Sequence, residues 1–411
     1  MKKIFKHIKE LIQVRPEGVR YIAGEAMAEL PTIKDAFLIV ESGRIVDFGP
    51  MQDCPTLEGA EVVDTTGRMI LPAWCDSHTH IVYAGNREGE FVDRIKGMSY
   101  AEIAEKGGGI LNSAAKLQAL DEDTLYEQSR VRLEEVMQLG TGAVEIKSGY
   151  GLTPEAELKM LRVIKRLQAD YPIPIKTTFL AAHAIPKKYK ENKAEFIRLM
   201  LEEVLPQVAE QGLAEYIDVF CEKGYFSVED TIQVMEAGAR YGLKPKIHVN
   251  QFTAIGGVAA GVAQKALSVD HLEVLLPEDI EALKGTETMP VALPSCSYFL
   301  SIPYTPAREL IAAGLPVALA TDYNPGSTPS GNMNFVVSTA CIKMKMTPEE
   351  AINAATINGA YAMGLEQEVG SITKGKRANL ILTKPINSYG VLPYSFGNPQ
   401  IDRVYINGVE L

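Results

Sequence analysis

Hydrophobic positions follow one pattern at the two ends of the chain and another in its middle. Residues 35–63 divide into short alternating apolar segments around a Ser-Gly turn, which predicts an antiparallel hairpin or meander. Residues 367–411 contain similar short segments, ANLILT and RVYING, separated by Gly or Pro. Between about 67 and 366, short apolar runs instead alternate with long amphipathic stretches. That alternation is typical of βα units around a parallel sheet.

Eight apolar runs in the middle of the chain are predicted to be strands. Two of the segments between them begin like helices, residues 155–169 after Thr153 and Pro154, and residues 348–363 after Thr347. Eight strands with crossover helices match a TIM-like (β/α)8 barrel, although the pattern alone also allows a doubly wound open sheet. The eight runs are 68–75, 142–148, 173–182, 216–221, 244–249, 266–271, 289–295 and 316–321.

The two β-rich ends are predicted to form one small unit beside the barrel. The ends of a barrel chain lie near each other, so the first and last segments can meet in space. We therefore predict an α/β protein with a barrel over residues 64–366 and a composite β-sandwich domain from residues 1–63 and 367–411. A chain of 411 residues with 46% apolar residues is long enough to bury a sizeable core without disulfides.

Charge and cysteine content narrow the class of partner and the compartment. The net charge of -11 argues against nucleic acid or an anionic membrane as a partner, because both require basic patches. The five cysteines include no CxxC pair, which favours a reducing compartment. The basic start, MKKIFKHIKELIQ, lacks the apolar core of a secretory signal. We expect a cytoplasmic protein that acts on a small molecule.

Histidines gather at the ends of the predicted strands. Only His7, in the basic N-terminal segment, lies elsewhere. The carboxyl ends of barrel strands converge on one face, where the active sites of such barrels are built. The residues at these ends are His78 and His80 after the first strand, His183 after the third, His248 near the end of the fifth, His271 at the end of the sixth, and Asp322 after the eighth.

His78-Thr79-His80 is the sharpest local signal for a metal site. Residues i and i+2 of an extended segment point to the same side, so both imidazoles can bind one ion. Taken alone, the pair fits a metal site and a coincidental pair of surface histidines equally well. Together with His248 and Asp322 it predicts a metal-dependent hydrolase with one catalytic ion. Three imidazoles and a carboxylate suit zinc or iron and not magnesium or calcium.

The segment LPAWCDSHTH resembles the opening of the amidohydrolase superfamily, in which a Leu-Pro-Gly turn leads into Asp-x-His-x-His. His248, His271 and Asp322 are similar to the rest of that pattern, and GSITKGKRANLIL resembles the return to the small β domain, so the resemblance covers nearly the whole chain. Ala73 and Trp74 replace the usual glycine and small apolar residue. Asn379 stands where aspartate is common, and we interpret it as structural.

Six further segments resemble a narrower family of amidohydrolases, those that hydrolyse the cyclic amide of 4-imidazolone-5-propanoate to N-formimidoyl-L-glutamate in histidine degradation. The resemblance implies one Zn2+ or Fe2+/Fe3+ per subunit, that substrate, and a homodimer. The alternatives are another amidohydrolase, such as a purine- or pyrimidine-type aminohydrolase, and a non-catalytic relative of the superfamily. The six segments are VYAGNREGEF, GMSYAEIAEKGGGI, EIKSGYGLT, TTFLAAHAIP, DYNPGS and ATINGAYAMG.

The resemblance also implies catalytic roles. Asp322 would both bind the metal and take the proton of the metal-bound water that attacks the ring carbonyl. His271 would hydrogen-bond that water or the developing oxyanion, the alternative being a histidine of the core or of the metal's outer surroundings. Gln251, three residues after His248, would contact the substrate. An amide cannot shuttle protons, so acid–base work would pass to Asp322 and His271.

Substrate contacts follow from the same resemblance. A guanidinium matches a carboxylate because it forms two parallel charge-assisted hydrogen bonds, so Arg87 would bind the propionate. A solvated surface arginine is the alternative, and the match of YAGNREGEF to the family segment outweighs it. The other implied substrate contacts are Tyr150, His183, Asn324, Gly326 and Ser327, with Gln251 as above.

Two features leave alternatives open. Gly107, Gly108 and Gly109 suggest either a lid that excludes water or a flexible connector. Glu222, at the end of the fourth predicted strand, is a candidate bridge to a second metal ion, but no further ligands for such an ion are assigned.

Overall fold

The computed structural model describes residues 2–98, 102–103, 106 and 108–411, and its largest part is a parallel barrel. Neighbouring barrel strands pair in parallel and follow one another in chain order. Short β10 (Lys244–Pro245) pairs with β9 just before β11 begins. The eight barrel strands are β6 (Trp74–Thr79), β7 (Thr141–Lys147), β8 (Ile175–Ala182), β9 (Tyr216–Cys221), β11 (Ile247–Val249), β12 (Ser268–His271), β13 (Met289–Ala292) and β14 (Ala318–Leu319).

The segment after the last strand returns to the first strand and nearly closes the barrel. Thr79 and Tyr323 form a parallel bridge just beyond the end of β14. The amide of Asp322 donates to the carbonyl of His78 at 3.0 Å, and the amide of His80 donates to the carbonyl of Tyr323 at 2.8 Å. The predicted (β/α)8 barrel is confirmed, and the open-sheet alternative is wrong. Closure also places Asp322 beside His78 and His80.

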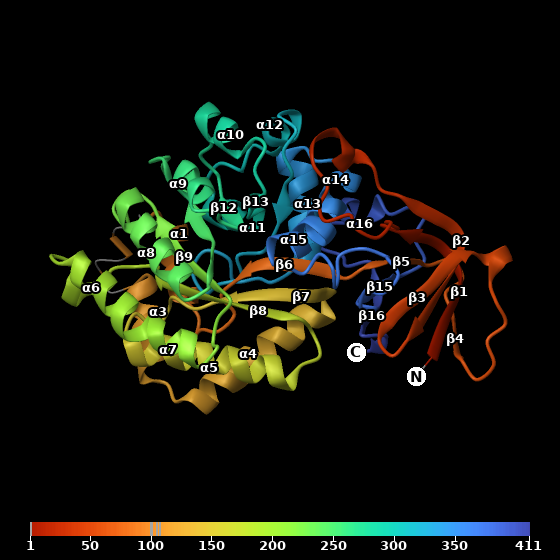
Figure 1. Ribbon diagram of the computed structural model, residues 1–411, viewed down its shortest axis with the longest axis horizontal. Helices are drawn as coiled ribbons and strands as arrows, with labels where there is room; N and C mark the ends of the chain where they lie inside the picture. Colours follow the sequence, from red (N-terminus) through yellow and green to blue (C-terminus); the bar gives the residue numbers. More distant parts are fainter. Residues whose placement is uncertain (1, 99–101, 104–105, 107) are drawn as a thin grey trace.

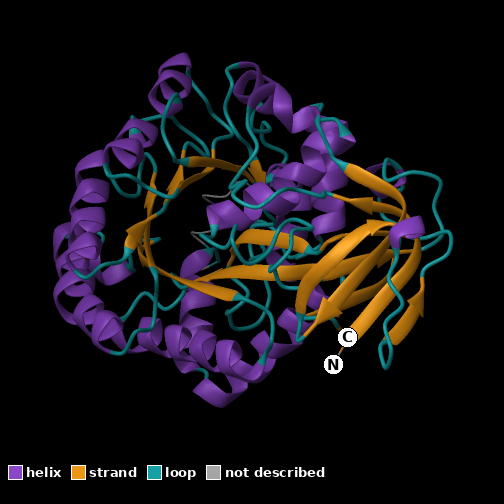
Figure 2. Cartoon of the chain, turned by 45° about the vertical axis from the view of Figure 1, so that its right-hand side comes forward, coloured by secondary structure: helices purple, strands orange, loops and turns teal. Residues whose placement is uncertain are grey.

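Helices surround the barrel, as Figure 2 shows. The two predicted helix starts are confirmed, since Thr153 caps α5 by accepting from the amide of Ala156, and Thr347 forms a capping box with Glu350. The longer helices are α1 (Glu88–Ile95), α3 (Ile110–Ala119), α4 (Glu122–Gln138), α5 (Pro154–Asp170), α8 (Val228–Arg240) and α13 (Met333–Met344). The shorter ones are α6 (Lys193–Leu199), α7 (Leu205–Glu210), α9 (Gly257–Ala263), α10 (Pro277–Leu283), α11 (Pro294–Leu300), α12 (Ala307–Ala312), α14 (Pro348–Asn353), α15 (Gly359–Ala362) and α16 (Val391–Tyr394).

Strands from both ends of the chain form a separate mixed sheet, at the right of Figure 1. Its centre is β1, which pairs antiparallel with β2 and parallel with β4 and β5. The Ser42-Gly43 turn joins β2 to β3 as an antiparallel hairpin, as the sequence predicts. The strands are β1 (Lys2–Ile12), β2 (Thr32–Glu41), β3 (Arg44–Pro50), β4 (Glu61–Asp64), β5 (Met69–Pro72), β15 (Leu380–Thr383), β16 (Ile401–Ile406) and β17 (Val409–Glu410).

The run predicted as one strand over 68–75 is divided between the two sheets. β5 pairs with β1 and β15 in the mixed sheet, whereas β6 starts the barrel at Trp74. The switch occurs within one residue, because the amide of Ala73 donates to Asn379 and the amide of Trp74 donates to Gly140, each at 2.9 Å. His78 consequently lies within a barrel strand and not after it. The domain boundaries at 63/64 and 366/367 stay a prediction.

The basic N-terminal segment is the long strand β1, most of whose side chains are buried or half-buried. None of the helices in the described part of the chain combines the length and the apolar character that a bilayer span requires.

Candidate active site and metal centre

Strained backbone marks the ends of the barrel strands where the histidines gather. His271, Asp322 and Asn250 have φ angles of 94°, 56° and 57°, in the left-handed region that side chains other than glycine rarely adopt. Such conformations cost about 1–3 kcal/mol each and persist only where the surrounding structure imposes them, most often at functional sites. All three residues are buried.

Four ligand atoms come together at these strand ends. The Nε2 atoms of His78 and His80 are 3.3 Å apart, and those of His80 and His248 are 3.4 Å apart. Asp322 Oδ1 lies 3.7 Å from His78 Nε2 and 3.6 Å from His80 Nε2. Ligands about 2.0–2.1 Å from a tetrahedral zinc ion lie about 3.4 Å from one another. His80 Nε2 therefore lies at a ligand-to-ligand distance from an atom of each of the other three residues, and His78, His80 and Asp322 form one candidate metal group among the described residues.

Protonation of the imidazoles also fits a cation. His78 Nδ1 lies 2.6 Å from Asp270 Oδ2, so Nδ1 carries the proton and Nε2 presents a lone pair. Burial, with further contributions from neighbouring cationic groups, lowers the pKa values of His78 and His80 well below their ordinary range. Neutral imidazole lone pairs and a carboxylate oxygen facing one another at these distances repel unless a cation lies between them. The residues fit zinc or iron(II).

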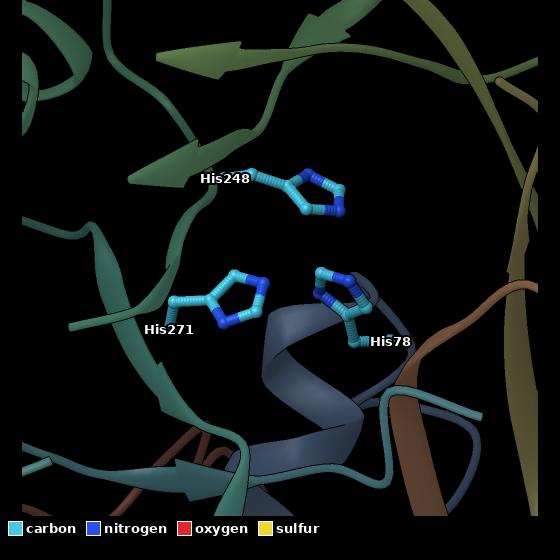
Figure 3. A group of neighbouring side chains, drawn as sticks. All are labelled: His78, His248 and His271. Atoms are coloured by element: carbon cyan, nitrogen blue, oxygen red, sulfur yellow. The ribbon is translucent and has the colours of Figure 1, made fainter. Parts of the chain in front are cut away.

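His271 and His183 lie at the edge of this cluster. Figure 3 shows the rings of His78, His248 and His271 turned toward a common space, and a ligand-type atom of each lies within 4.8 Å of the others. Burial by itself would lower the pKa of His271. The carboxylate of Glu273, 3.2 Å from its Nδ1, and other nearby carboxylates more than offset this effect, so the pKa of His271 lies above its ordinary value. The His183 ring stacks on the His80 ring with 5.4 Å between the ring centroids, and His183 Nδ1 lies 3.0 Å from the Gly149 carbonyl oxygen.

Asp322 presents its two carboxylate oxygens to different partners. Oδ1 faces the imidazoles, whereas Oδ2 accepts from the Ser327 hydroxyl at 3.3 Å. Burial raises the pKa of the carboxyl above its usual range. The loop after it is held by Asn324, whose Oδ1 accepts from the amides of Gly326 and Ser327, each at 2.8 Å.

A cavity leads from the ligand cluster toward the surface. Its inner part, of about 50 Å³, is lined by His80, His248, His271 and Asp322 among others. Its outer part, of about 350 Å³, shares six lining residues with the inner part. The structure brings together every predicted substrate contact along the outer part, which is lined by Arg87, Tyr150, His183, Gln251, Asn324, Gly326 and Ser327.

Arg87 is held in place from both sides. Its Nε and Nη2 atoms lie 2.7 and 2.6 Å from Glu90 Oε2, and its side chain is only 7% exposed. Glu90 also accepts from the amide of Gly109 at 3.1 Å. On the other side, a Cβ atom built on Gly326 would lie 2.0 Å from Arg87 Nη1, so the guanidinium approaches the backbone where only glycine leaves room.

Gly326→Ala tests this close approach. The added methyl group displaces the Arg87 guanidinium. If Arg87 binds the substrate, KM for that substrate is expected to rise about 10–100-fold, the equivalent of one charge-assisted hydrogen bond, with a smaller change in kcat. Steady-state kinetics measures both constants. Gly390→Ala is the matched control, because its Cβ would lie 3.5 Å from its nearest neighbour. Equal KM values for the two variants would contradict the expected displacement.

The structure also places Gln251 and Glu222. Gln251 is buried and donates from Nε2 to Cys296 Sγ at 3.4 Å at the wall of the cavity. Glu222 accepts from the amides of Phe252 and Thr253 at 2.9 and 3.2 Å, and it belongs to none of the candidate metal groups found among the described residues. The contacts therefore favour a structural role for Glu222. Gly107 lies outside the described residues, and the lid stays a hypothesis.

Sequence reasoning missed the charged side chains beneath the ligand cluster. They are fully buried in or directly beside the barrel strands, where an unpaired charge is very costly. A charged residue in a strand predicted to be buried on both faces was the available signal. The sequence also provided no indication of three further residues that line the outer cavity, Arg94, Phe220 and Tyr225. The buried charged residues are Glu145, Lys147, Asp218, Lys246 and Asp270.

Comparison with known proteins identifies the family and supports the fold. The sequence model of the amidohydrolase family matches residues 69–411. Among solved structures, guanine deaminase from C. acetobutylicum with bound guanine superposes with a TM-score of 0.75 at 16% identity, covering 100% of both chains. An adenosine deaminase from Xanthomonas campestris with bound zinc superposes with a TM-score of 0.71 at 17% identity, covering 99% of this chain and 92% of the other. At these identities the likeness supports the fold.

Relatives found by sequence are much more similar to this chain than these solved structures are. The chain is 68% identical to the imidazolonepropionase of Flavobacterium johnsoniae over 98% of both chains. It is 65% identical to the imidazolonepropionase of Christiangramia forsetii over 99% of both chains. The chain therefore belongs to the amidohydrolase family and, within it, to the imidazolonepropionases, which are metal-dependent hydrolases.

Proposed function

We propose that His78, His80, His248 and Asp322 hold one zinc or iron ion, and that the site hydrolyses the cyclic amide of 4-imidazolone-5-propanoate to N-formimidoyl-L-glutamate. The observation that carries the proposal is that His80 Nε2 lies 3.3–3.6 Å from a ligand atom of each of the other three residues, at the bottom of a cavity whose outer wall includes Arg87. When bound, the ion would lower the pKa of water toward ~7 and polarise the ring carbonyl.

Asp322 is the proposed proton acceptor. With Oδ1 directed at the imidazoles, Oδ2 remains to take the proton of the attacking water and pass it to the leaving ring nitrogen. Gln251 orients water or the ring through its amide. His271, whose pKa is raised beside Glu273, donates from Nε2 to the carbonyl oxygen as that oxygen gains negative charge.

The rest of the cavity is proposed to bind the substrate. Arg87 pairs with the propionate carboxylate, and Tyr150 and His183 pack on the ring or hydrogen-bond it. Asn324, Gly326 and Ser327 hold the polar end through their amide, hydroxyl and backbone groups. A purine- or pyrimidine-type aminohydrolase would use the same metal ligands but would have no carboxylate for Arg87.

Arg87→Ala distinguishes these two substrates. Loss of a charge-assisted pair is expected to raise KM for the imidazolone about 10–100-fold, with kcat changed less, because the carboxylate lies away from the reacting carbonyl. Arg166→Ala, which removes an exposed arginine paired with Asp123, serves as the control. An unchanged KM in Arg87→Ala would remove the support for a carboxylate substrate.

Metal removal tests the reaction and the ion together. Dialysis against a strong chelator is expected to abolish imidazolone ring opening, and zinc or iron(II) added at one equivalent per chain is expected to restore it. The assay follows loss of the imidazolone absorbance. Full activity in protein that elemental analysis shows to be free of metal would contradict the proposal. No turnover by the metal-loaded protein would contradict the substrate alone.

We also propose that the protein works in the cytoplasm as a homodimer. All five cysteines are free, and three are buried, which suits a reducing compartment. The dimer rests on the family resemblance. Light scattering coupled to size exclusion tests it, and the mass of a single chain would contradict it.

A further inference from the structure

A cluster of five charged side chains lies beneath the candidate metal site, inside the barrel. All five are 0% exposed, and they come from β7, β9, β12 and the residue between β10 and β11. Neither the hydrolytic reaction nor the proposed ligand set uses them. Ionised groups in the barrel interior cost several kcal/mol each unless they are paired. The five residues are Glu145, Lys147, Asp218, Lys246 and Asp270.

Two of the carboxylates hold metal-ligand imidazoles from behind. Asp270 Oδ2 lies 2.6 Å from His78 Nδ1. Asp218 Oδ2 lies 3.0 Å from His248 Nδ1, as an ion-pair contact without the alignment of a full hydrogen bond, and Asp218 Oδ1 accepts from the His248 amide at 3.1 Å. A carboxylate on the far nitrogen of an imidazole fixes the ring's tautomer and direction toward a metal.

One ammonium group joins these two carboxylates. Lys147 Nζ lies 2.9 Å from Asp218 Oδ2 and 3.6 Å from Asp270 Oδ2, the same oxygen atoms that face the imidazoles. It also donates to Glu145 Oε1 at 2.7 Å. Lys147 is thus two contacts away from His78 and from His248, each time through a single carboxylate oxygen.

The second ammonium has different partners. Lys246 pairs with the other oxygen of Glu145 and donates to the carbonyls of Ala362, at 2.9 Å, and Ser77, at 3.4 Å. No ion pair or hydrogen bond joins it to Asp218 or Asp270 in the part of the chain that the structure describes, although its positive charge acts on Asp270 through space and opposes the rise in that carboxyl's pKa caused by burial. The two lysines therefore carry the same charge in the same cluster, but only Lys147 touches the carboxylates behind the ligands.

We infer that Lys147 is a positioning residue of the metal site, which locks the carboxylates of Asp218 and Asp270 in the geometry that directs His78 and His248 at the ion. The inference rests on the metal site proposed above. The direction of the change in metal affinity separates this role from a simple charge effect. Removing a nearby positive charge would by itself strengthen cation binding, whereas releasing the two carboxylates weakens it.

The test uses metal-depleted full-length protein loaded with Co2+, which reports ligand geometry through its visible absorption. Wild type is expected to bind one Co2+ per chain. Lys147→Met is expected to bind Co2+ about 10–100-fold more weakly, as measured by competition with a chelator, and to show shifted absorption bands. Lys246→Met, the matched control, is expected to bind at least as tightly as wild type, with unchanged bands.

Folding is kept separate from binding by circular dichroism and a second variant. Lys147→Met/Glu145→Gln removes one charge of each sign, keeps the net charge of the cluster, and still leaves Asp218 and Asp270 without Lys147; it is expected to bind Co2+ as weakly as the single variant. Equal or tighter binding by Lys147→Met overturns the inference, as do equal losses in both lysine variants. If Lys246→Met folds and neither Lys147 variant does, Lys147 belongs to the fold and not to the metal site. Wild type that binds no Co2+ overturns the metal site itself.

Discussion

Asp322→Asn is expected to lower kcat about 10³-fold or more while the metal stays bound. The amide oxygen of asparagine can still face His78 and His80, but an amide cannot accept the proton that Oδ2 of Asp322 is proposed to take. Positioned general acid–base groups contribute about 10²–10⁴-fold, and neither Gln251 nor a neutral imidazole directed at the ion replaces this one. KM is expected to change little, because the carboxylate of the substrate is proposed to bind at Arg87, away from Asp322.

The measurement is kcat per metal-loaded site, with metal content determined on the same sample. Metal content separates a lost proton acceptor from a lost ligand. Asp64→Asn, which changes an exposed carboxylate in the mixed sheet, serves as the control and is expected to leave kcat unaltered. A fully metal-loaded Asp322→Asn variant with kcat within tenfold of wild type would show that another group takes the proton.

Gly359→Ala is expected to destabilise the protein by about 2–3 kcal/mol, although alanine normally stabilises a helix relative to glycine by up to ~1 kcal/mol. Gly359 begins α15, and its Cβ would lie 2.4 Å from the backbone oxygen of Cys75 and 3.2 Å from Cys75 Cβ. Cys75 belongs to β6, the strand that carries His78. Backbone cannot move aside as a flexible side chain does, so either the helix or β6 must shift.

Thermal and urea unfolding measure the loss of stability, and activity reports the shift of β6. Gly89→Ala makes the same chemical change within α1, where a Cβ would meet no atom within 4 Å. It is expected to leave stability unchanged or raise it by up to ~1 kcal/mol. Gly359→Ala unfolding at the wild-type midpoint would show that α15 moves away from β6 at no cost.

Local patterns were sufficient for most of the barrel. Alternation between apolar runs and helical stretches predicted eight strands, and Thr153 and Thr347 marked helix starts that the structure confirms. The exception is the run over 68–75. Both of its halves are apolar and extended, so periodicity cannot tell that hydrogen bonds to Asn379 and Gly140 send adjacent residues into different sheets.

Residue type and position along the chain established that histidines and Asp322 would meet, because the carboxyl ends of parallel strands share one face of a barrel. The resemblance to relatives added the reaction. Ligand distances, the lone pair on His78 and the raised pKa of Asp322 depended on the folded chain, since each arises from groups far apart in sequence.

Lys147 shows most clearly the difference between what the sequence indicates and what the folded chain decides. In the sequence it is one charged residue in an apolar strand. Its partners Asp218 and Asp270 lie on β9 and β12, and only closure of the barrel brings them within 2.9 and 3.6 Å. Periodicity and motif spacing therefore determined the fold class and the candidate ligand residues, whereas long-range contacts decided the geometry and protonation of the site.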